Sequence, residues 1–285
     1  MDQSFQTDSL KEIDFIRLSR FIEDHLGIKM PAAKKVMLES RLQKRLHVLR
    51  YATFSQYLDF VFSDEGLRSE LYHMIDAITT NKTDFFREAD HFEFLLNTWL
   101  PKYANLWNAS NPCRIWSAGC ASGEEVYTLM IVMEEFQHQN PSFSYSITGT
   151  DISLKVLQDA VNGVYPEEKI ANLPVEYKKR YFLKSKNVER HEIRVKPEFR
   201  NKVHFERLNL MDSEYPFTQS FDFIFCRNVI IYFDKKIQNQ LVRHLAHHIR
   251  KDGLLFLGHS ESMTGMNLPF TIVAPTVYCK KKEFV

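Results

Sequence analysis

The sequence predicts an α/β protein, in which an all-helical N-terminal domain precedes a mostly parallel β-sheet covered by helices on both faces. Two observations carry this prediction. Apolar residues recur at helical spacing up to about residue 80, whereas short apolar runs alternate with helical segments from about residue 113. An apolar content of 44% in 285 residues is ample for such a core, so we expect a globular chain.

The N-terminal segment, from residue 9 to about residue 80, contains only helical patterns. Its first helix is expected to begin at a capping box, Ser9–Glu12, and to end at Gly27, and a second helix follows Pro31. Thr53–Gln56 repeats the capping-box pattern before a third helix, and "LRSELYHMIDAI" predicts one more. The expected apolar positions of the first helix are Leu10, Ile13, Ile16 or Phe15, Phe21, Ile22 and Leu26.

The rest of the chain reads as strands alternating with helices. "CRIWSAG", "YSITGTDI", "VHFERLNL", "FDFIFCRNVII" and "GLLFLGHS" are each followed by a turn, and parallel strands of this kind bind ligands at their carboxyl ends. The charged stretch 165–200 is longer than a crossover helix and contains the alternating run "HEIRV", so we expect a small inserted β subdomain there. The terminal "FTIVAPTVYCKKK" is predicted to be one edge strand.

Composition excludes several classes of function. A formal net charge of +1 argues against a surface devoted to nucleic acid or anionic lipid. The four cysteines have no CxxC spacing and no histidine at zinc-ligand spacing, which predicts reduced thiols and no metal. The N-terminus does not resemble a signal peptide, and there is no run of about 18 uncharged apolar residues. We therefore expect a cytoplasmic protein without membrane insertion.

The stretch "RIWSAGCASGEEVYTL", residues 114–129, predicts a strand, a glycine turn and the start of a helix. Such turns often hold phosphates, but Glu124 and Glu125 would repel a pyrophosphate and favour a cationic ligand. Ser122–Glu125 also fits a capping box, and the local sequence supports either interpretation about equally.

Asp151 follows the next strand, where an ionised carboxylate can accept hydrogen bonds from both hydroxyls of a ribose. The alternative is a helix N-cap, for which Ser153 is an equally good candidate. A ribose and a positive charge without phosphates describe S-adenosylmethionine. Further polar residues stand where they can reach such a ligand, after later strands or at a helix start, namely Asn209, Arg227, Asn228, Asn81, Thr83 and Arg87.

Taken in order, "TTNKTDFFREADHF", "WSAGCASGEEVYTL", "GTDIS", "FCRNVIIYFDKK" and "DGLLFLGHSES" resemble the chemotaxis receptor methyltransferase family, CheR. The resemblance covers nearly the whole chain. It implies a Rossmann-like S-adenosylmethionine-dependent methyltransferase sheet, with residues 1–82 as a receptor-facing helical domain, 83–285 as the methyltransferase domain and about 165–200 as its β subdomain. It also implies methylation of glutamate side chains on bacterial chemoreceptors, with S-adenosylhomocysteine as product.

The resemblance assigns roles to individual residues. Arg87 and Tyr232 match the residues proposed to orient the reacting groups, which makes them the catalytic candidates. The positions that match cofactor contacts are Asn81, Thr83, Arg87, Glu125, Asp151, Asn209, Leu210, Arg227 and Asn228. No metal is implied. In members that dock a receptor's C-terminal pentapeptide, glycines shape the docking loop, and here "KSKNVERHE" replaces them.

The partner implied by the resemblance is the cytoplasmic domain of a chemoreceptor. The protein itself is expected to be a monomer. The segment 31–50 is expected to offer a basic helix face through Lys34, Lys35, Arg41, Lys44 and Arg45. A basic face would steer the enzyme towards glutamate-rich methylation sites. The alternative is an ordinary solvated helix face.

The residues disfavour two other functions and leave a third open. A nicotinamide-dependent dehydrogenase is disfavoured by the acids on the glycine turn and by the missing G-x-G-x-x-G pattern. A nucleic-acid base methyltransferase is disfavoured by the near-zero net charge and by "RNVIIY" in place of an Asn-Pro-Pro-Tyr type motif. A binding module of the same fold that does not turn over stays open, because fold alone does not decide activity.

Overall fold

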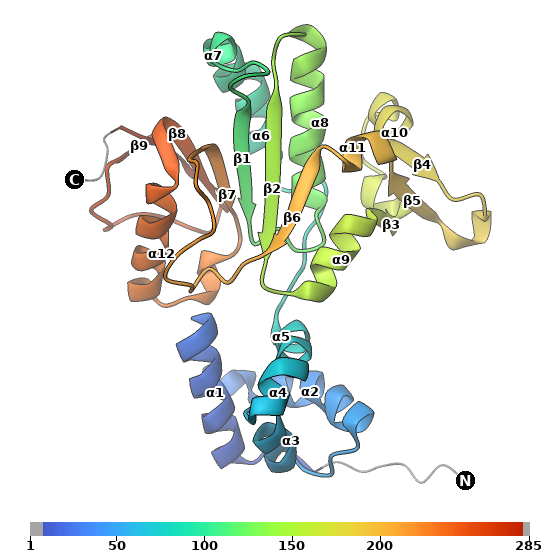
Figure 1. Cartoon of the computed structure of the whole chain (residues 1–285), viewed down its shortest axis with the longest axis vertical. Coiled ribbons are helices and arrows are strands. Elements are labelled where there is room, and N and C mark those ends of the chain that lie inside the picture. The colour runs from blue at the N-terminus through green and yellow to red at the C-terminus, as the bar shows by residue number, and fades with distance from the viewer. Residues whose placement is uncertain (1–7, 282–285) are drawn as a thin grey trace. The chain divides into compact units, whose positions relative to one another are not determined.

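The computed structural model describes residues 8–281, apart from the side chain of Val188. The chain forms two compact units, both visible in Figure 1. The helical unit comprises the chain up to Thr80 with Asn209–Met211 and Tyr232–Ile237, and the sheet unit comprises Asn81–Leu208, Asp212–Ile231 and the chain from Gln238 onward.

Between residues 8 and 80, the helical unit contains five α-helices. They are α1 (Glu12–Leu26), α2 (Lys35–Leu49), α3 (Phe54–Val61), α4 (Asp64–Ser69) and α5 (Leu71–Ile78), with a 3₁₀ turn at Ala32–Lys34 before α2. Each long helix buries one apolar stripe, and Leu38, Leu42 and Leu46 of α2 are fully buried. Gly27 ends α1 with φ at 69°, as the sequence predicts. The Thr53 hydroxyl accepts the backbone N–H of Gln56, which confirms that capping residue.

The start of α1 differs from the prediction. The helix begins at Glu12 after Lys11, whose side chain makes no capping hydrogen bond, so the predicted capping box at Ser9–Glu12 is wrong. The buried stripe contains Leu18, whereas Ile13 is 75% exposed. A helical stripe about 100° wide can be drawn through either set of apolar positions, and tertiary packing decides between them.

Two arginines of α2 hold the helical unit together instead of facing solvent. Arg45 donates to both oxygens of Glu70, at 2.8 and 2.6 Å, and Glu70 is only 3% exposed. Arg41 donates to the carbonyls of Ile78 and Thr79, at 2.6 and 3.0 Å, and so caps the end of α5. The expectation that these two arginines belong to an exposed basic face is therefore wrong.

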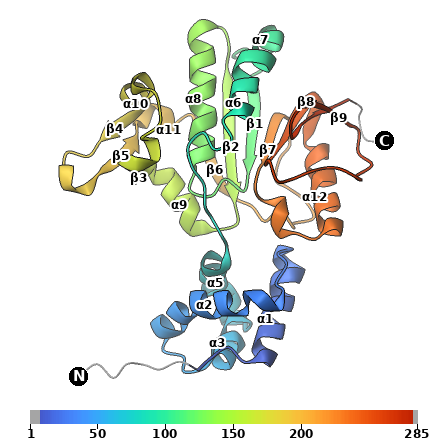
Figure 2. The same ribbon diagram turned by 180° about the vertical axis from the view of Figure 1, so that it is seen from behind.

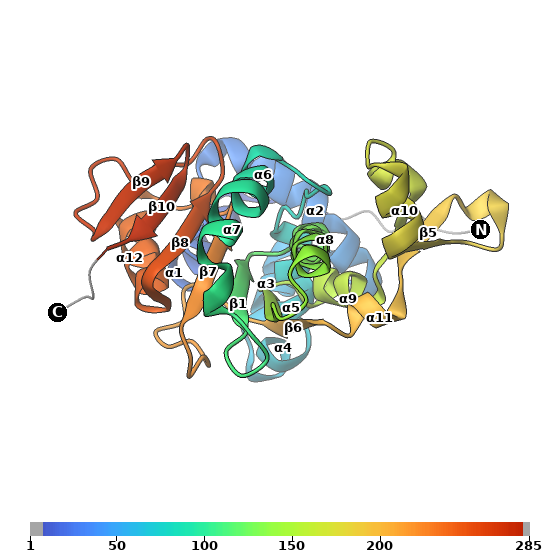
Figure 3. The same ribbon diagram turned by 90° about the horizontal axis from the view of Figure 1, so that it is seen from above.

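The sheet unit is built on seven strands in the order β6-β2-β1-β7-β8-β10-β9. Their bounds are β1 (Cys113–Ala118), β2 (Tyr145–Asp151), β6 (Val203–Arg207), β7 (Phe221–Cys226), β8 (Ile249–Leu257), β9 (Phe270–Ala274) and β10 (Val277–Lys280). The strands of this sheet lie side by side in Figure 3. The five strands from β6 to β8 are parallel, so their carboxyl ends share one edge of the sheet. The predicted Rossmann-like sheet is confirmed.

Helices pack along this sheet in the expected alternation. They are α6 (Asp90–Phe94), α7 (Leu100–Tyr103), α8 (Glu124–Gln139), α9 (Leu154–Asn162), α11 (Pro197–Arg200) and α12 (Lys235–His247), and α8 and α6 lie along one face in Figure 2. The chain ends in a hairpin rather than in the single edge strand predicted: β9 is the edge, and β10 lies between β8 and β9. A turn just before Val277 divides the predicted strand into β9 and β10.

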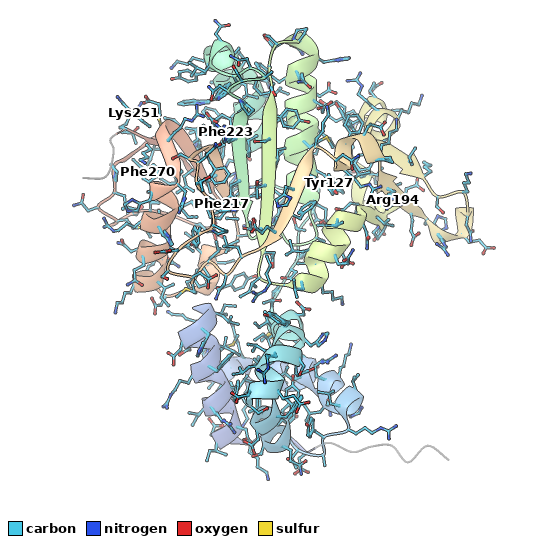
Figure 4. The ribbon with its side chains drawn as sticks, in the orientation of Figure 1. Tyr127, Arg194, Phe217, Phe223, Lys251 and Phe270 are labelled. Atoms are coloured by element: carbon cyan, nitrogen blue, oxygen red, sulfur yellow. The ribbon has the colours of Figure 1, made fainter. Side chains whose placement is uncertain are left out.

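A small antiparallel sheet, β3-β5-β4, forms within the predicted 165–200 insertion and the residue before it. Its strands are β3 (Val164–Pro166), β4 (Phe182–Lys184) and β5 (Glu192–Val195), and α10 (Val175–Tyr181) precedes β4. Figure 4 shows Arg194 on this small sheet, well away from Phe223 in the main sheet. The run "HEIRV" is confirmed as a strand.

The four cysteines, Cys113, Cys120, Cys226 and Cys279, are free thiols and all are buried. Burial raises the pKa of Cys113, Cys120 and Cys226 well above the ordinary value. Within residues 8–281, no helix combines the length and the apolar character needed to cross a membrane.

Candidate functional site

The glycine turn between β1 and α8 is tightly packed. Gly119, Ala121 and Gly123 all have left-handed backbone angles, with φ of 81°, 47° and 91°. A Cβ added at Gly119 would come within 2.6 Å of the Val229 side chain. Glycine is therefore required at that position both for its backbone angle and for the close approach of the neighbouring loop.

The two acids after this turn have different partners. Glu124 is 2% exposed, accepts a hydrogen bond from Ser122 at 2.6 Å and lies 3.3 Å from Lys169 Nζ. Glu125 accepts from the Ser117 hydroxyl at 2.7 Å and from Arg227 Nη1 at 2.9 Å. The capping-box interpretation of Ser122–Glu125 is wrong, because the N-cap of α8 is Gly123 and no side chain caps the helix.

Arg227, directly after β7, is the centre of a buried charge network that we call the Arg227 network: Glu88, Glu125, Arg227 and Asn228. The Arg227 side chain is 2% exposed, and its guanidinium pairs with Glu125 and, at 2.9 Å, with Glu88. It also donates to the carbonyl of Arg87 and lies over the Phe92 ring, 5.2 Å from its centroid. Two carboxylates thus share one guanidinium.

Glu88 was not predicted as a site residue. It accepts from Arg227 and from Asn228 Nδ2, the latter at 3.2 Å. Burial alone would raise the pKa of Glu88, but the hydrogen bond and the charge of Arg227 outweigh burial and lower the pKa below its usual value. The signal available in the sequence was its place beside Arg87 in "FFREADHF".

Glu261, also missed, fixes the turn that carries Arg227 and Asn228. It is 4% exposed and accepts the backbone N–H groups of Asn228 at 2.9 Å, Gly258 at 2.6 Å and Ile231 at 3.2 Å. Asn228 is held with φ at 58°, a left-handed conformation that asparagine tolerates better than most residues. The buried carboxylate therefore replaces the hydrogen bonds that this irregular turn cannot make internally.

The segment before α6 carries further predicted residues. Arg87 donates to the carbonyl of Lys82 at 3.0 Å, and the N–H of Phe86 donates to the Thr128 hydroxyl at 3.1 Å. Phe86 and Glu88, on either side of Arg87, have φ of 51° and 56°. Strained left-handed residues cluster at functional sites, where surrounding contacts hold them in place. This segment is therefore held in a specific shape next to the Arg227 network.

Asp151 links the end of β2 to the glycine turn. It is 8% exposed, and its two oxygens accept the backbone N–H groups of Ala121 at 2.9 Å and Ser153 at 3.0 Å. Ser153 is the N-cap of α9 and accepts the N–H of Val156. The alternative in which Asp151 caps this helix is thus excluded, and its carboxylate lies beside the glycine turn.

The predicted residues fall into two groups. In the sheet unit, the structure connects Arg87, Glu125, Arg227 and Asn228 through the network, and it ties Asp151 to the glycine turn. Asn81 and Thr83 belong to the same unit, whereas Asn209, Leu210 and Tyr232 belong to the helical unit.

Within the helical unit, Asn209 and Tyr232 have contacts of their own. The Asn209 amide donates to the carbonyl of His25 at 2.9 Å. The Tyr232 carbonyl accepts the N–H of Lys29 at 2.9 Å, and its ring centroid lies 5.9 Å from Lys34 Nζ. Both residues are thus held in defined positions on this unit.

One group of side chains within residues 8–281 has the spacing of metal ligands. The potential ligand atoms of Glu88, His91 and His259 lie within 4.8 Å of one another. Both oxygens of Glu88 already accept hydrogen bonds from Arg227 and Asn228, so this carboxylate is engaged within the Arg227 network. We assign no metal to this group, and the metal-free site stays a prediction.

Comparison with known proteins finds matches over most of the chain. Residues 13–79 match the family described as "CheR methyltransferase, all-alpha domain", and residues 81–279 match "CheR methyltransferase, SAM binding domain". The chain is 41% identical to the chemotaxis protein methyltransferase of Borreliella burgdorferi, over 93% of each chain. It is 34% identical to that of Escherichia coli, over 96% of this chain and 93% of that one. The chain therefore belongs to the CheR methyltransferase family.

Proposed function

We propose that this protein transfers the methyl group of S-adenosylmethionine to glutamate side-chain carboxylates on the cytoplasmic domains of chemoreceptors, in the cytoplasm and as a monomer. Membership of the CheR methyltransferase family supports the reaction class. The observation that carries the proposal is the Arg227 network beside the glycine turn, in which two carboxylates face one guanidinium. The resulting formal charge of −1 favours a cationic group, such as the α-ammonium or the sulfonium of S-adenosylmethionine.

The residues proposed to hold the cofactor are Asn81, Thr83, Arg87, Glu125, Asp151, Asn209, Leu210, Arg227 and Asn228. When bound, the cofactor supplies an electrophilic methyl group on a sulfonium. Asp151 offers a carboxylate to a ribose, and Glu125 offers one to an ammonium group. Glu261 contributes indirectly, because it holds the turn on which Arg227 and Asn228 stand.

The reaction needs positioning more than proton transfer. A glutamate carboxylate has a pKa of about 4.3 and is already ionised near neutral pH, so no general base is needed. Arg87 and Tyr232 are the proposed orienting residues, and they must align the carboxylate with the methyl carbon. A strong ion pair would stabilise the ground state too much, because the carboxylate loses charge in the transition state. A modest polar clamp from the two side chains is therefore the better arrangement.

The receptor contact is proposed for the helical domain, residues 1–82, but with fewer basic residues than the sequence suggests. Arg41 and Arg45 are engaged within the unit. Lys44 is exposed and is the best candidate for a receptor contact. Lys34 and Lys35 are half-buried, and Lys35 pairs with Glu12.

The proposal is tested with methyl-labelled S-adenosylmethionine and receptor-bearing membranes. We expect label on the receptor that alkali releases as methanol, because carboxyl methyl esters hydrolyse readily in base. The matched control is the Arg87→Ala variant, which should bind receptor membranes but incorporate less label. Label that is absent or stable to base contradicts the proposal, and cofactor binding without any label would favour a non-catalytic binding module.

A further inference from the structure

Lys169 connects the small β subdomain to the predicted cofactor segment. It lies in a 3₁₀ turn at Glu167–Ile170, directly after β3. Its Nζ donates to the Thr83 carbonyl at 2.6 Å and to Asp84 Oδ1 at 2.7 Å. The same Nζ is 3.3 Å from Glu124 Oε1. One ammonium group from the subdomain thus contacts both the Thr83 segment and the first residue of α8.

The charge of Lys169 is stabilised where it stands. Burial alone would lower the pKa of Lys169, but the hydrogen bond to Asp84 and the charges of Glu124 and Asp84 raise the pKa above the ordinary value. The lysine is therefore cationic at neutral pH. Glu124 is 2% exposed, so loss of Lys169 would leave a buried carboxylate without its cation.

Aromatic contacts hold the same two parts together. Phe85 meets Tyr165 and Phe182 of the subdomain edge-on, with ring centroids 5.1 and 5.4 Å apart. The Tyr165 hydroxyl donates to the Ser122 carbonyl in the glycine turn at 2.7 Å. The subdomain therefore packs against both the Thr83 segment and the glycine turn.

We propose that Lys169 is a positioning residue for the cofactor, which holds the Thr83 segment in its binding shape from the small subdomain. The inference rests on the proposed function, since Thr83 is a proposed cofactor contact. It gives the subdomain a role at the methyl-transfer site that is separate from any receptor docking. Because binding free energies couple reciprocally, a change that shifts the subdomain alters cofactor affinity, and cofactor binding in turn rigidifies the subdomain.

The test compares Lys169→Met with Lys184→Met, a lysine of the same subdomain that pairs with Glu167 on the exposed surface. The dissociation constant of S-adenosylhomocysteine is measured by calorimetry, and the receptor KM and the melting temperature of the free protein are measured beside it. Lys169→Met should raise the dissociation constant by about tenfold or more, since it removes charged hydrogen bonds. The receptor KM should stay unchanged, and Lys184→Met should leave all three values unchanged.

The double variant Glu124→Gln/Lys169→Met separates positioning from simple charge neutralisation. It removes the unpaired carboxylate and so restores stability if Lys169→Met alone unfolds. Its dissociation constant should stay raised, because the Thr83 carbonyl and Asp84 still lack their donor. A return to the wild-type value would overturn the inference. Wild-type protein that does not bind S-adenosylhomocysteine would instead overturn the proposed function, whereas normal binding by all variants would overturn only the role of Lys169.

Discussion

Arg227 and Glu125, 102 residues apart in the chain, form an ion pair with 2.9 Å between Nη1 and Oε2 and with only 2% and 13% of their side chains exposed. Removing one partner of a buried ion pair is strongly destabilising, because the other charge is left without compensation. In this protein the same guanidinium also serves Glu88. We therefore expect the pair to contribute to the stability of the sheet unit and to the charge beside the proposed cofactor site.

Arg227→Met should lower the free energy of unfolding by about 3–5 kcal/mol, because Glu88 and Glu125 lose their shared cation. It should also weaken S-adenosylhomocysteine binding. Urea denaturation and calorimetry measure the two effects. The control is Lys251→Met at an exposed position, which should stay within about 0.5 kcal/mol of the wild type. Wild-type stability in Arg227→Met would contradict the described network.

His91 should make stability fall in mild acid. Burial, followed by the charge of Arg227, lowers the pKa of His91 from 6.5 to about 4. Between these values the unfolded chain takes up a proton that the folded chain does not, so stability rises with pH across this window and is lost as pH falls from 6.5 to 4.

The size of this effect follows from the pKa shift and is roughly 3 kcal/mol. His91→Gln keeps a group able to hydrogen-bond to Thr276 but removes the titration. The difference in unfolding free energy between wild type and variant should therefore shrink or reverse as pH falls from 7 to 4. Denaturant unfolding at several pH values measures it, and a difference that does not change with pH would contradict the prediction.

Lys44 and Arg45, adjacent in α2, should respond very differently to charge reversal. Arg45→Glu places a second acid against the buried Glu70 and should destabilise the helical unit by about 3–5 kcal/mol. Lys44→Glu should leave the melting temperature unchanged but raise the KM for receptor, more so at low salt. Equal loss of stability in both variants would contradict the assignment of Lys44 as exposed and of Arg45 as an internal partner of Glu70.

Tyr232→Phe should lower kcat at saturating receptor and cofactor by about 10-fold or more, since misplaced reacting groups cost rate steeply. The backbone contact of Tyr232 with Lys29 does not need the hydroxyl, so the helical unit should keep its melting temperature. Steady-state methylation measures the effect. An unchanged kcat in both Tyr232→Phe and Arg87→Ala would remove these residues from the proposed clamp.

The fold could be predicted because its signals are local. Strands and helices alternate, and capping at Thr53 and termination at Gly27 depend on a few neighbouring residues. Local patterns failed where two solutions fit equally well. The capping-box pattern occurs at Ser9–Glu12 and at Ser122–Glu125, yet no side chain of either segment caps a helix. In each case tertiary contacts decide which local pattern is realised.

The partners of charged residues could not be predicted from the sequence. Glu124 and Glu125 are neighbours with the same chemistry, yet one pairs with Lys169 and the other with Arg227. Arg45 lies in a basic segment whose composition is typical of a solvated helix face. It nevertheless pairs with Glu70, 25 residues away. These choices depend on long-range packing, which composition and periodicity do not record.

Because all four cysteines are buried, the native protein should give little background in thiol labelling. Thiols react as thiolates, and burial both hinders access and keeps the pKa high. A maleimide probe should therefore not react with the four native cysteines of the folded protein. A single cysteine introduced at the exposed Lys44 would carry the only reactive label, and its fluorescence would test the proposed receptor contact of the helical unit.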